Sequence, residues 1–151
     1  MFKKTLAFVA LLALAGCQSG GTSVDVQVKE LSIGGCMIEL LDEKGGSVMV
    51  QSPAQYSNFE RELNAMSAVN ENCASDIELP EIDFASAVFV ASNEEGTCGL
   101  DFDVVTTLDD GVLHVDWVEN LPEEPHCESA MLGALAAELS ELPEDVTILV
   151  D

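Results

Sequence analysis

The chain has 151 residues, of which 48% are hydrophobic, and a formal net charge of −23. Its length suits one domain with a hydrophobic core, and the apolar runs between the charges favour a folded domain over a disordered one. The 28 acidic residues against 5 basic ones exclude a nucleic-acid partner and direct adhesion to anionic lipid headgroups, because both need a basic surface.

The N-terminal segment has the pattern of a secretory signal. Lys3 and Lys4 form a basic head, and residues 6–14 form an apolar run that is shorter than the about 20 residues needed to span a bilayer. The segment ends in Leu-Ala-Gly-Cys, at Cys17. This pattern predicts a signal peptide over residues 1–16.

The Leu-Ala-Gly-Cys sequence resembles the lipobox of bacterial lipoproteins. The resemblance implies that Cys17 carries the lipid, palmitate included, that anchors the mature chain to the membrane, and that residues 17–23 form a lipidated tether. Gln18 stands where an acidic residue often means retention in the inner membrane. The outer membrane is therefore favoured, with the domain facing the periplasm or the cell surface. An incidental cysteine, with cleavage after another small residue, is the alternative.

Removal of residues 1–16 leaves 28 acidic residues against Lys29, Lys44 and Arg61, a formal charge of −25. The acidic residues are scattered along the chain and form no single tail. They predict a solvated acidic surface, which keeps the domain soluble and suits a salty environment. A dedicated cation site is the rival interpretation.

The exported part contains four further cysteines: Cys36, Cys73, Cys98 and Cys127. An even number in an oxidising compartment predicts two disulfides, for which three connectivities exist. Zinc is the alternative, but no Cys-x-x-Cys pair is present, and we expect no metal site and no cofactor. A hairpin described below brings Cys98 near the loop that holds Cys127, so we expect these two to pair. Cys36 and Cys73 then pair by elimination.

Residues 24–151 are expected to form one domain. Apolar and polar side chains alternate over residues 24–28, which predicts a strand. Residues 36–41 and 47–51 are typical of a hairpin around the turn at residues 42–46.

The clearest helix signal begins at Ser52. Ser52 can cap a helix, Pro53 fits the first turn, and Gln55 can complete a capping box. Apolar residues then follow at spacings of three and four and give one apolar face: Tyr56, Phe59, Leu63 and Met66. We expect this amphipathic helix to end before Cys73.

Four strand signals follow the helix. Residues 87–91 are an unbroken apolar run, which predicts a strand covered on both faces, and residues 93–96 predict a turn after it. Alternation over residues 100–104 and 113–117 predicts two strands joined by an Asp-Gly hairpin turn. Residues 146–150 predict the last strand.

Residues 130–142 are ambiguous between helix and strand. Alanines and regularly spaced leucines favour a helix by propensity, and Pro143 ends the segment. The expected fold class is α+β, mainly antiparallel β-sheet with one clear amphipathic helix, stapled by disulfides.

From about residue 51 to residue 150 the chain resembles the small exported domains called PrcB-like, or protease-complex-subunit-like. The shared features are a capped helix before Pro-x-Ile-Asp-Phe (residues 80–84), a Gly-x-x-Gly sequence (residues 96–99), a β-hairpin, a loop cysteine, and Leu-Pro before the last strand. The resemblance implies an antiparallel α+β domain, a strand before Pro143, and a noncatalytic role beside a protease. The family's Thr-Gly-Gly-Tyr appears here as Thr-Cys-Gly-Leu at residues 97–100.

The turn-rich sequence after the apolar run is the expected contact with such a partner: Glu94, Glu95, Gly96 and Thr97. It combines exposed charges with glycine, and loops of this kind often carry binding residues.

Catalytic patterns are sparse. His114 and Asp116 alternate with apolar residues and could act as a base and its orienter, but a solvated strand face explains them equally. His126 adjoins Cys127, which we expect in a disulfide, so a Cys-His nucleophile is not expected. The acidic sequences at residues 101–103 and 109–111 lack the spacing of a calcium loop.

The sequence therefore predicts that the protein is not an enzyme. It predicts a lipid-anchored cell-envelope protein that contacts the membrane through lipid at Cys17 and has a binding or accessory role, modulating an envelope protease in the form that the resemblance suggests. A small carboxylate-dependent hydrolase and a cation-binding envelope protein are the alternatives.

Overall fold

Two helices and two four-stranded sheets make up the part of the chain that the computed structural model describes, residues 22–31, 36–70, 73, 79–97, 99–121 and 130–150. In chain order the elements are β1 (Thr22–Ser23), β2 (Gln27–Leu31), α1 (Met37–Glu43), β3 (Ser47–Val50), α2 (Pro53–Val69), β4 (Ala87–Gly96), β5 (Phe102–Asp109), β6 (Val112–Glu119), β7 (Met131–Ser140) and β8 (Thr147–Val150).

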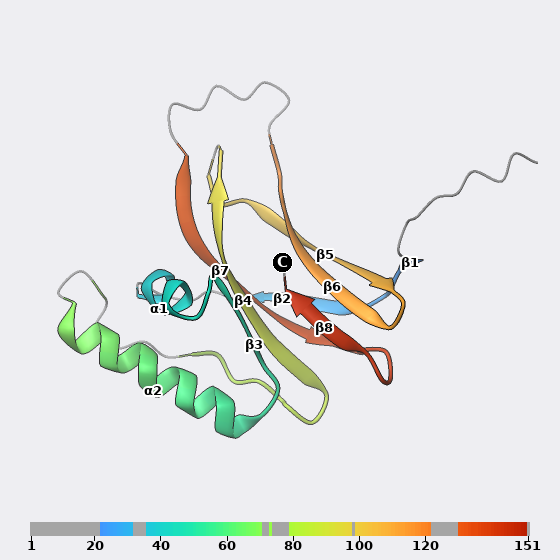
Figure 1. The fold of residues 1–151 in the computed structure, drawn as a ribbon, viewed down its shortest axis with the longest axis horizontal. Coiled ribbons are helices and arrows are strands. Elements are labelled where there is room, and N and C mark those ends of the chain that lie inside the picture. Colours follow the sequence, from blue (N-terminus) through green and yellow to red (C-terminus); the bar gives the residue numbers. More distant parts are fainter. Residues whose placement is uncertain are drawn as a thin grey trace, which may run out of the picture.

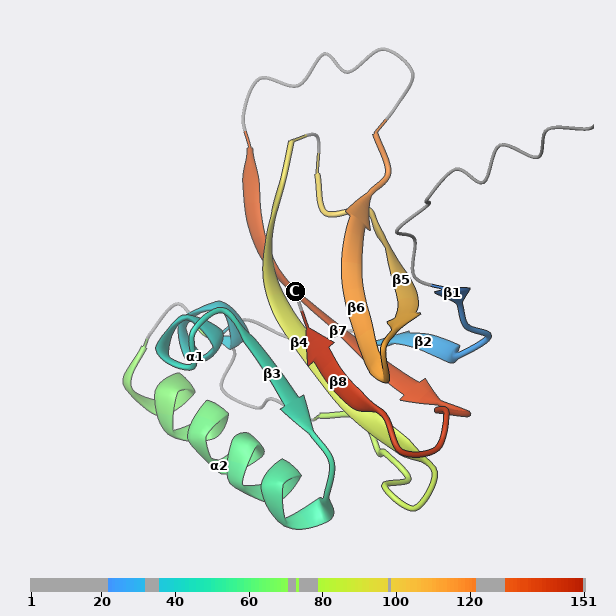
Figure 2. The same ribbon diagram turned by 45° about the vertical axis from the view of Figure 1, so that its right-hand side comes forward.

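The strands form an inner sheet in the order β2-β7-β4-β3 and an outer sheet in the order β1-β5-β6-β8. Every strand pair is antiparallel except β6 and β8, which are parallel. Both helices lie on one side of the inner sheet, and the outer sheet lies on the other side (Figures 1 and 2). The expected α+β fold with mainly antiparallel strands is confirmed.

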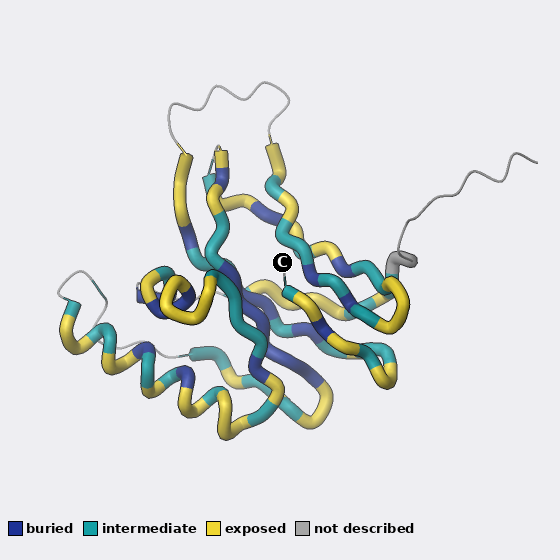
Figure 3. The backbone as a smooth tube through the Cα atoms, viewed as in Figure 1, coloured by how far each residue is buried: buried dark blue, intermediate teal, exposed yellow. Residues whose placement is uncertain are grey.

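Strand β4 is buried on both faces. Phe89 and Ala91 pack into a core with the helices, whereas Val88 and Val90 pack into a second core between the sheets. Its tube is almost continuously buried in its first half (Figure 3). The unbroken apolar run over residues 87–91 predicted this placement correctly, because a strand covered on both faces has no polar side to present.

Helix α2 begins as its capping sequence predicts. The Gln55 backbone N–H donates to Ser52 Oγ at 3.3 Å, and Gln55 Oε1 accepts from the Gln51 N–H at 2.9 Å. Pro53 is the first helical residue, and Phe59 and Leu63 are buried against the inner sheet. The apolar face therefore covers the sheet, as its spacing indicates.

Tyr56 joins α2 to the chain that follows it. Its hydroxyl donates to the Pro80 carbonyl oxygen at 2.7 Å, and its ring centroid lies 5.2 Å from those of Phe84 and Phe89. Burial, with smaller contributions from the charges of Glu60 and Glu138, raises the pKa of Tyr56 to about 12. The phenol is thus held neutral in the aromatic core.

The expected strand over residues 36–41 is wrong, because these residues form α1. Met37, Leu40 and Leu41 are spaced as on one helix face, and all three are buried in the core with α2. Gly45 and Gly46 follow with φ of +95° and +101°, a region that glycine enters without a side-chain clash. Helix α1 therefore ends before these glycines, and the chain reverses direction through them into β3.

The expected turn over residues 93–96 is also wrong. β4 continues to Gly96, paired with Met131 of β7. Asn93, a residue that favours turns, instead uses its amide: Nδ2 donates to the Ile38 carbonyl at 2.9 Å and to Asp42 Oδ1 at 2.7 Å. A tertiary contact with α1 therefore outweighs the local preference for a turn.

Residues 131–140 form β7, not the helix that their propensity favours. Ala136 packs on the helix side, and Ala137 and Leu139 pack between the sheets. Because both faces of β7 are covered, one by the core with the helices and one by the core between the sheets, small apolar residues fit on both sides, and the alanines supply them. The strand implied by the family resemblance is what the structure shows.

The remaining strands agree with the sequence except near the start. β5 and β6 form the predicted hairpin, with Asp110 at φ 47° and Gly111 at φ 80° in its turn, and β8 is the predicted last strand. The strand expected over residues 24–28 begins only at Gln27, although Val24 and Val26 do pack against the core between the sheets.

We predict that Tyr56, the only tyrosine of the chain, titrates at about pH 12, against about 10 for an exposed phenol. The folded protein keeps this proton where the unfolded chain loses it. The free energy of unfolding should therefore be unaffected below about pH 10 and fall as the pH rises toward 12. Ultraviolet absorbance of the phenolate reports the titration, and urea unfolding reports the stability.

The Tyr56→Phe variant is the control. It should lose this high-pH dependence and about 1 kcal/mol of stability, from the hydrogen bond to Pro80. Titration of the folded protein near pH 10 would contradict the prediction.

Candidate functional site

A cavity of about 230 Å³ opens between the two sheets. Its walls come from the end of β2 (residues 30–31), the start of β5 with the residues before it (100–102), Trp117 of β6 and residues 134–136 of β7. Four segments far apart in the sequence therefore meet around it. The cavity lies beside β7 beyond the last pairing of β2, which is Leu31 with Ala136.

Two glycines let the chain after β4 fold against the strands and form one wall. A side chain at Gly133 would collide with the Leu100 side chain, and one at Gly96 would collide with the Gly99 carbonyl. The clash with backbone means that position 96 needs glycine, whereas at position 133 the Leu100 side chain would have to shift. This close approach places Leu100 and Asp101 at the cavity.

Trp117, the only tryptophan of the chain, is one of the residues that line the cavity. Its indole Nε1 is buried and has no hydrogen-bond acceptor among the described residues. A buried donor left unpaired costs about 1–3 kcal/mol. No local pattern marks Trp117 as a site residue, and its being the only tryptophan of the chain was the available signal.

The charge around the cavity is acidic. Glu30 and Asp101 contribute to its walls, and no basic residue does. The basic side chains of the described residues are engaged elsewhere: Lys29 with Glu138 at 3.2 Å, Lys44 with Glu62 at 2.6 Å, and Arg61 with Asn58. The hydrogen bond from Lys44 lowers the pKa of Glu62.

The expected contact loop is not a loop. Glu94, Glu95 and Gly96 lie in β4, with Glu95 exposed and Gly96 buried, and only Thr97 lies beyond the strand. Glu94 pairs with Gly133. The four residues therefore mark the far end of the β4–β7 ladder, where the chain turns.

Exposed apolar side chains gather at this same end of the molecule. Of nine large hydrophobic residues that are exposed among the described ones, five lie here and form what we name the strand-end patch: Leu100, Val118, Leu121, Met131 and Leu132. They lie at the end of β6, at the start of β7, or in the chain directly after β4 or β6. These ends of the three strands reach the same side of the fold (Figure 1).

His114 and Asp116 lie on one face of β6, as the alternation predicts. Their neighbours Leu113 and Val115 are buried between the sheets, so these two side chains point away from the inner sheet. The other candidate partner of a nucleophile, His126, lies outside the described residues.

The acidic residues considered as calcium ligands, at 101–103 and 109–111, lie in separate places in the fold. Asp101 lines the cavity, whereas Asp103 pairs across the sheet with Val118. Asp110 belongs to the tight turn between β5 and β6. They do not converge on one point.

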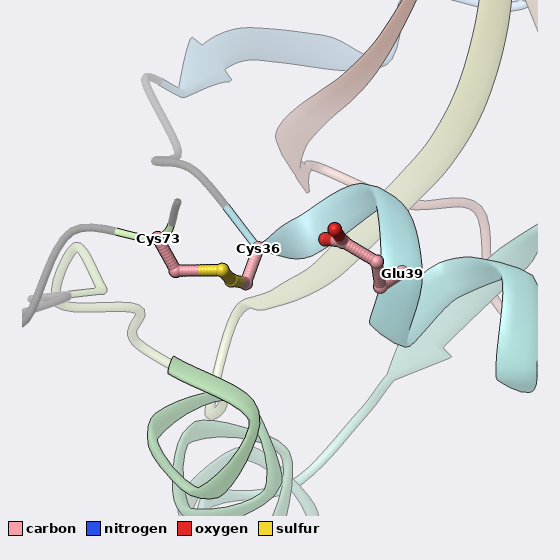
Figure 4. Close-up of side chains that lie close together, drawn as sticks. All are labelled: Cys36, Glu39 and Cys73. Atoms are coloured by element: carbon pink, nitrogen blue, oxygen red, sulfur yellow. A yellow bond between two sulfur atoms is a disulfide. The ribbon is translucent and has the colours of Figure 1, made fainter. Parts of the chain in front are cut away.

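Cys36 and Cys73 form a disulfide-compatible pair with 5.4 Å between their Cα atoms, within the usual range for a disulfide. Cys36 precedes α1 and is fully buried, and Cys73 follows α2 (Figure 4). Glu39 lies close enough for the three to hold a metal ion, but a disulfide would leave neither sulfur available. Cys17, Cys98 and Cys127 lie outside the described residues.

No family model, curated protein or solved structure matches the chain. Among the helices that the structure describes, none is long and apolar enough to cross a membrane.

We predict that Cys36 bonds to Cys73 and Cys98 to Cys127 in the oxidised protein. The first bond should contribute about 4 kcal/mol in the chain-entropy model, given its separation of 37 residues. Non-reducing peptide mapping identifies the pairs, and the double Cys36→Ser, Cys73→Ser variant should melt at a clearly lower temperature. A peptide joining Cys36 to Cys98, or Cys73 to Cys127, would contradict the pairing.

Proposed function

We propose that this protein is a lipid-anchored cell-envelope protein with a noncatalytic binding or accessory role. Lipid on Cys17 would hold it at the membrane, with the outer membrane favoured by Gln18, and its partner would be an envelope protein. The PrcB-like resemblance supports a protease as that partner. The observation that carries the proposal is the strand-end patch.

The patch suits a protein partner because it concentrates exposed apolar surface on an otherwise acidic domain. Scattered single apolar residues need no explanation, but a group at one end of a fold marks an interaction site. Aromatic residues and methionine are enriched in interfaces, and Met131 and Leu132 are each about half exposed. Burial of such side chains against a partner would supply the affinity.

The same end also offers a strand edge that is unpaired within the described part of the chain. β2 pairs only with residues 136–140 of β7, whereas β4 pairs with residues 131–140. Residues 131–135 therefore have no strand neighbour on their second side among the described residues. An extended segment of a partner can add to such an edge through backbone hydrogen bonds, with the flanking side chains giving specificity.

Glu94 and Glu95 lie on the neighbouring strand, opposite Gly133 and Leu132. Charges at the rim of an interface act mainly on the rate of association and on the choice of partner. The residues expected from the sequence as contacts thus stay part of the proposal, as strand residues beside the patch.

The lipid anchor gives the first prediction of this proposal. The intact mass of the mature protein should show a lipid adduct on Cys17, and Cys17→Ser should release the domain from membranes or leave it unprocessed. A Cys17→Ser protein that is processed normally and still partitions into detergent would overturn the anchor.

The partner contact gives the second prediction. A double Met131→Ser, Leu132→Ser variant should recover about tenfold less of an envelope partner in crosslinking from native envelopes, the effect expected when about 1.4 kcal/mol is lost. Val69→Ser is the matched control, because Val69 is a highly exposed apolar residue on α2, away from the patch.

Changing Glu94 and Glu95 to Ala should alter partner recovery while leaving the melting temperature unchanged, because charges on partly or fully exposed side chains contribute little to stability. Equal recovery by the patch variant and the Val69 control, or recovery of no envelope protein by the unaltered chain, would count against the proposed role.

A further inference from the structure

The strand edge over residues 131–135 of β7 has backbone groups that point outward. The backbone N–H of Asn93 in β4 points to the β3 side, where it donates to the carbonyl of the residue before β3 at 2.8 Å. Successive residues of a strand in an antiparallel ladder direct their N–H and C=O groups to opposite sides. Glu94 therefore directs its groups to its partner Gly133. By the same alternation, the groups of Leu132 and Ala134 point to the edge that no described strand covers.

The cavity between the sheets lies directly beside this edge. The last pair of β2 is Leu31 with Ala136, and the next position along β7 is Leu135, which lines the cavity. Side chains alternate across a strand, so Leu135 shares a face with Ala137 and Leu139, which pack between the sheets. A residue placed opposite Leu135 would direct its side chain to that same face, and hence into the cavity.

The cavity has the size and lining for one apolar side chain. Its volume of about 230 Å³ is below the roughly 300–1,000 Å³ of pockets for drug-sized ligands. Leu100, Phe102 and Trp117 supply further apolar walls. In strand addition the backbone hydrogen bonds give affinity, and pockets for alternate side chains give specificity. The edge and the cavity together provide both parts of such a site.

The charge of the protein decides which kind of partner supplies the added strand. The formal net charge of the chain is −23, so a second copy or another acidic protein would be repelled. Lys29, Lys44 and Arg61 are engaged with side chains of this chain and offer little attraction to an acidic segment. Complementary charge steers association and suppresses wrong partners. The charge therefore favours a basic segment.

We infer that the edge over residues 131–135 binds an extended, basic segment of a partner protein, which adds to β7 as an antiparallel strand in line with β2. The segment's backbone pairs with Leu132 and Ala134, and an apolar side chain opposite Leu135 fills the cavity. This inference rests on the proposed partner-binding role and names the kind of segment that the site takes.

The test uses a synthetic peptide, acetyl-Leu-Thr-Val-Thr-Val-Lys-Lys-amide, whose leucine lies opposite Leu135 when the peptide continues the line of β2. The purified protein is titrated by calorimetry, and the fluorescence of Trp117, the only tryptophan, reports the cavity. Binding should be saturable and should change the emission. A peptide with serine in place of the leucine should bind several-fold more weakly and leave the emission nearly unchanged.

Methylated peptides test the backbone pairing on the unaltered protein. Methylation of the two threonine amides removes the N–H groups that face Leu132 and Ala134, and should raise the Kd at least about tenfold. Methylation of the two valine amides, which face away from β7, is the matched control and should change the Kd little. Replacement of both lysines by glutamate should raise the Kd several-fold, and added salt should weaken the binding of the lysine peptide.

A proline variant tests the edge of the protein itself. Ala134→Pro removes one outward N–H and keeps the N–H groups that pair with β4, a position at which an edge strand tolerates proline. It should raise the Kd of the lysine peptide at least about tenfold. Val28→Pro is the matched control, because alternation along β2 turns the Val28 groups away from β7. Thermal melting confirms that both variants are folded, and the methylated peptides decide alone if Ala134→Pro is not.

The inference is overturned if the lysine peptide does not bind saturably, if the two methylated peptides bind equally, or if the glutamate peptide binds as tightly as the lysine peptide. A dimer of the unaltered protein in sedimentation that Ala134→Pro dissociates would assign the edge to a second copy, and would overturn it too. If the peptide fails but the variant with serine at positions 131 and 132 still loses its envelope partner, the proposed function stands without strand addition. If the peptide binds but no envelope partner is recovered, the proposed function fails instead.

Discussion

The architecture depends on one ladder, the ten-residue antiparallel pairing of β4 with β7, which is buried on both of its faces along much of its length. Each strand supplies alternate residues to two separate cores, so the ladder holds α1 and α2 on one side and the outer sheet on the other. Loss of this pairing would separate three layers at once. The same ladder extends beyond both cores, and its protruding end carries the strand-end patch and one side of the cavity.

The parts of the fold that were predictable are those whose signal is local. Helix α2 has a capping sequence and a four-residue apolar face, and the Asp-Gly turn fixes the hairpin of β5 and β6. Helix α1 is too short for its spacing to stand out, and Asn93 gave a turn signal that its hydrogen bonds to α1 override. For β7 the alanines pointed to a helix, because the need for small residues between two cores appears only after the layers are assembled.

The candidate site likewise has parts that local sequence predicts and parts that it does not. Cys17 and the proposed contact residues Glu94 and Glu95 could be named from patterns in one stretch of sequence. The cavity could not, because residues 30–31, 100–102, Trp117 and 134–136 share no sequence pattern and meet only through strand register. The strongly acidic composition pointed toward a solvated surface and gave no reason to single out Glu30 and Asp101, the two acidic residues at the mouth of the cavity.

The position of β7 in the chain bears on how the domain folds. It is the ninth of ten elements, yet it lies second in the inner sheet and is the strand with which β2 pairs. When a chain with this topology emerges from a membrane with its N-terminal end first, β2 has no neighbour to pair with until about nine-tenths of the sequence has passed. Contacts between distant parts of a chain form slowly, so the topology itself delays folding, which would keep the polypeptide unfolded for the export that we propose.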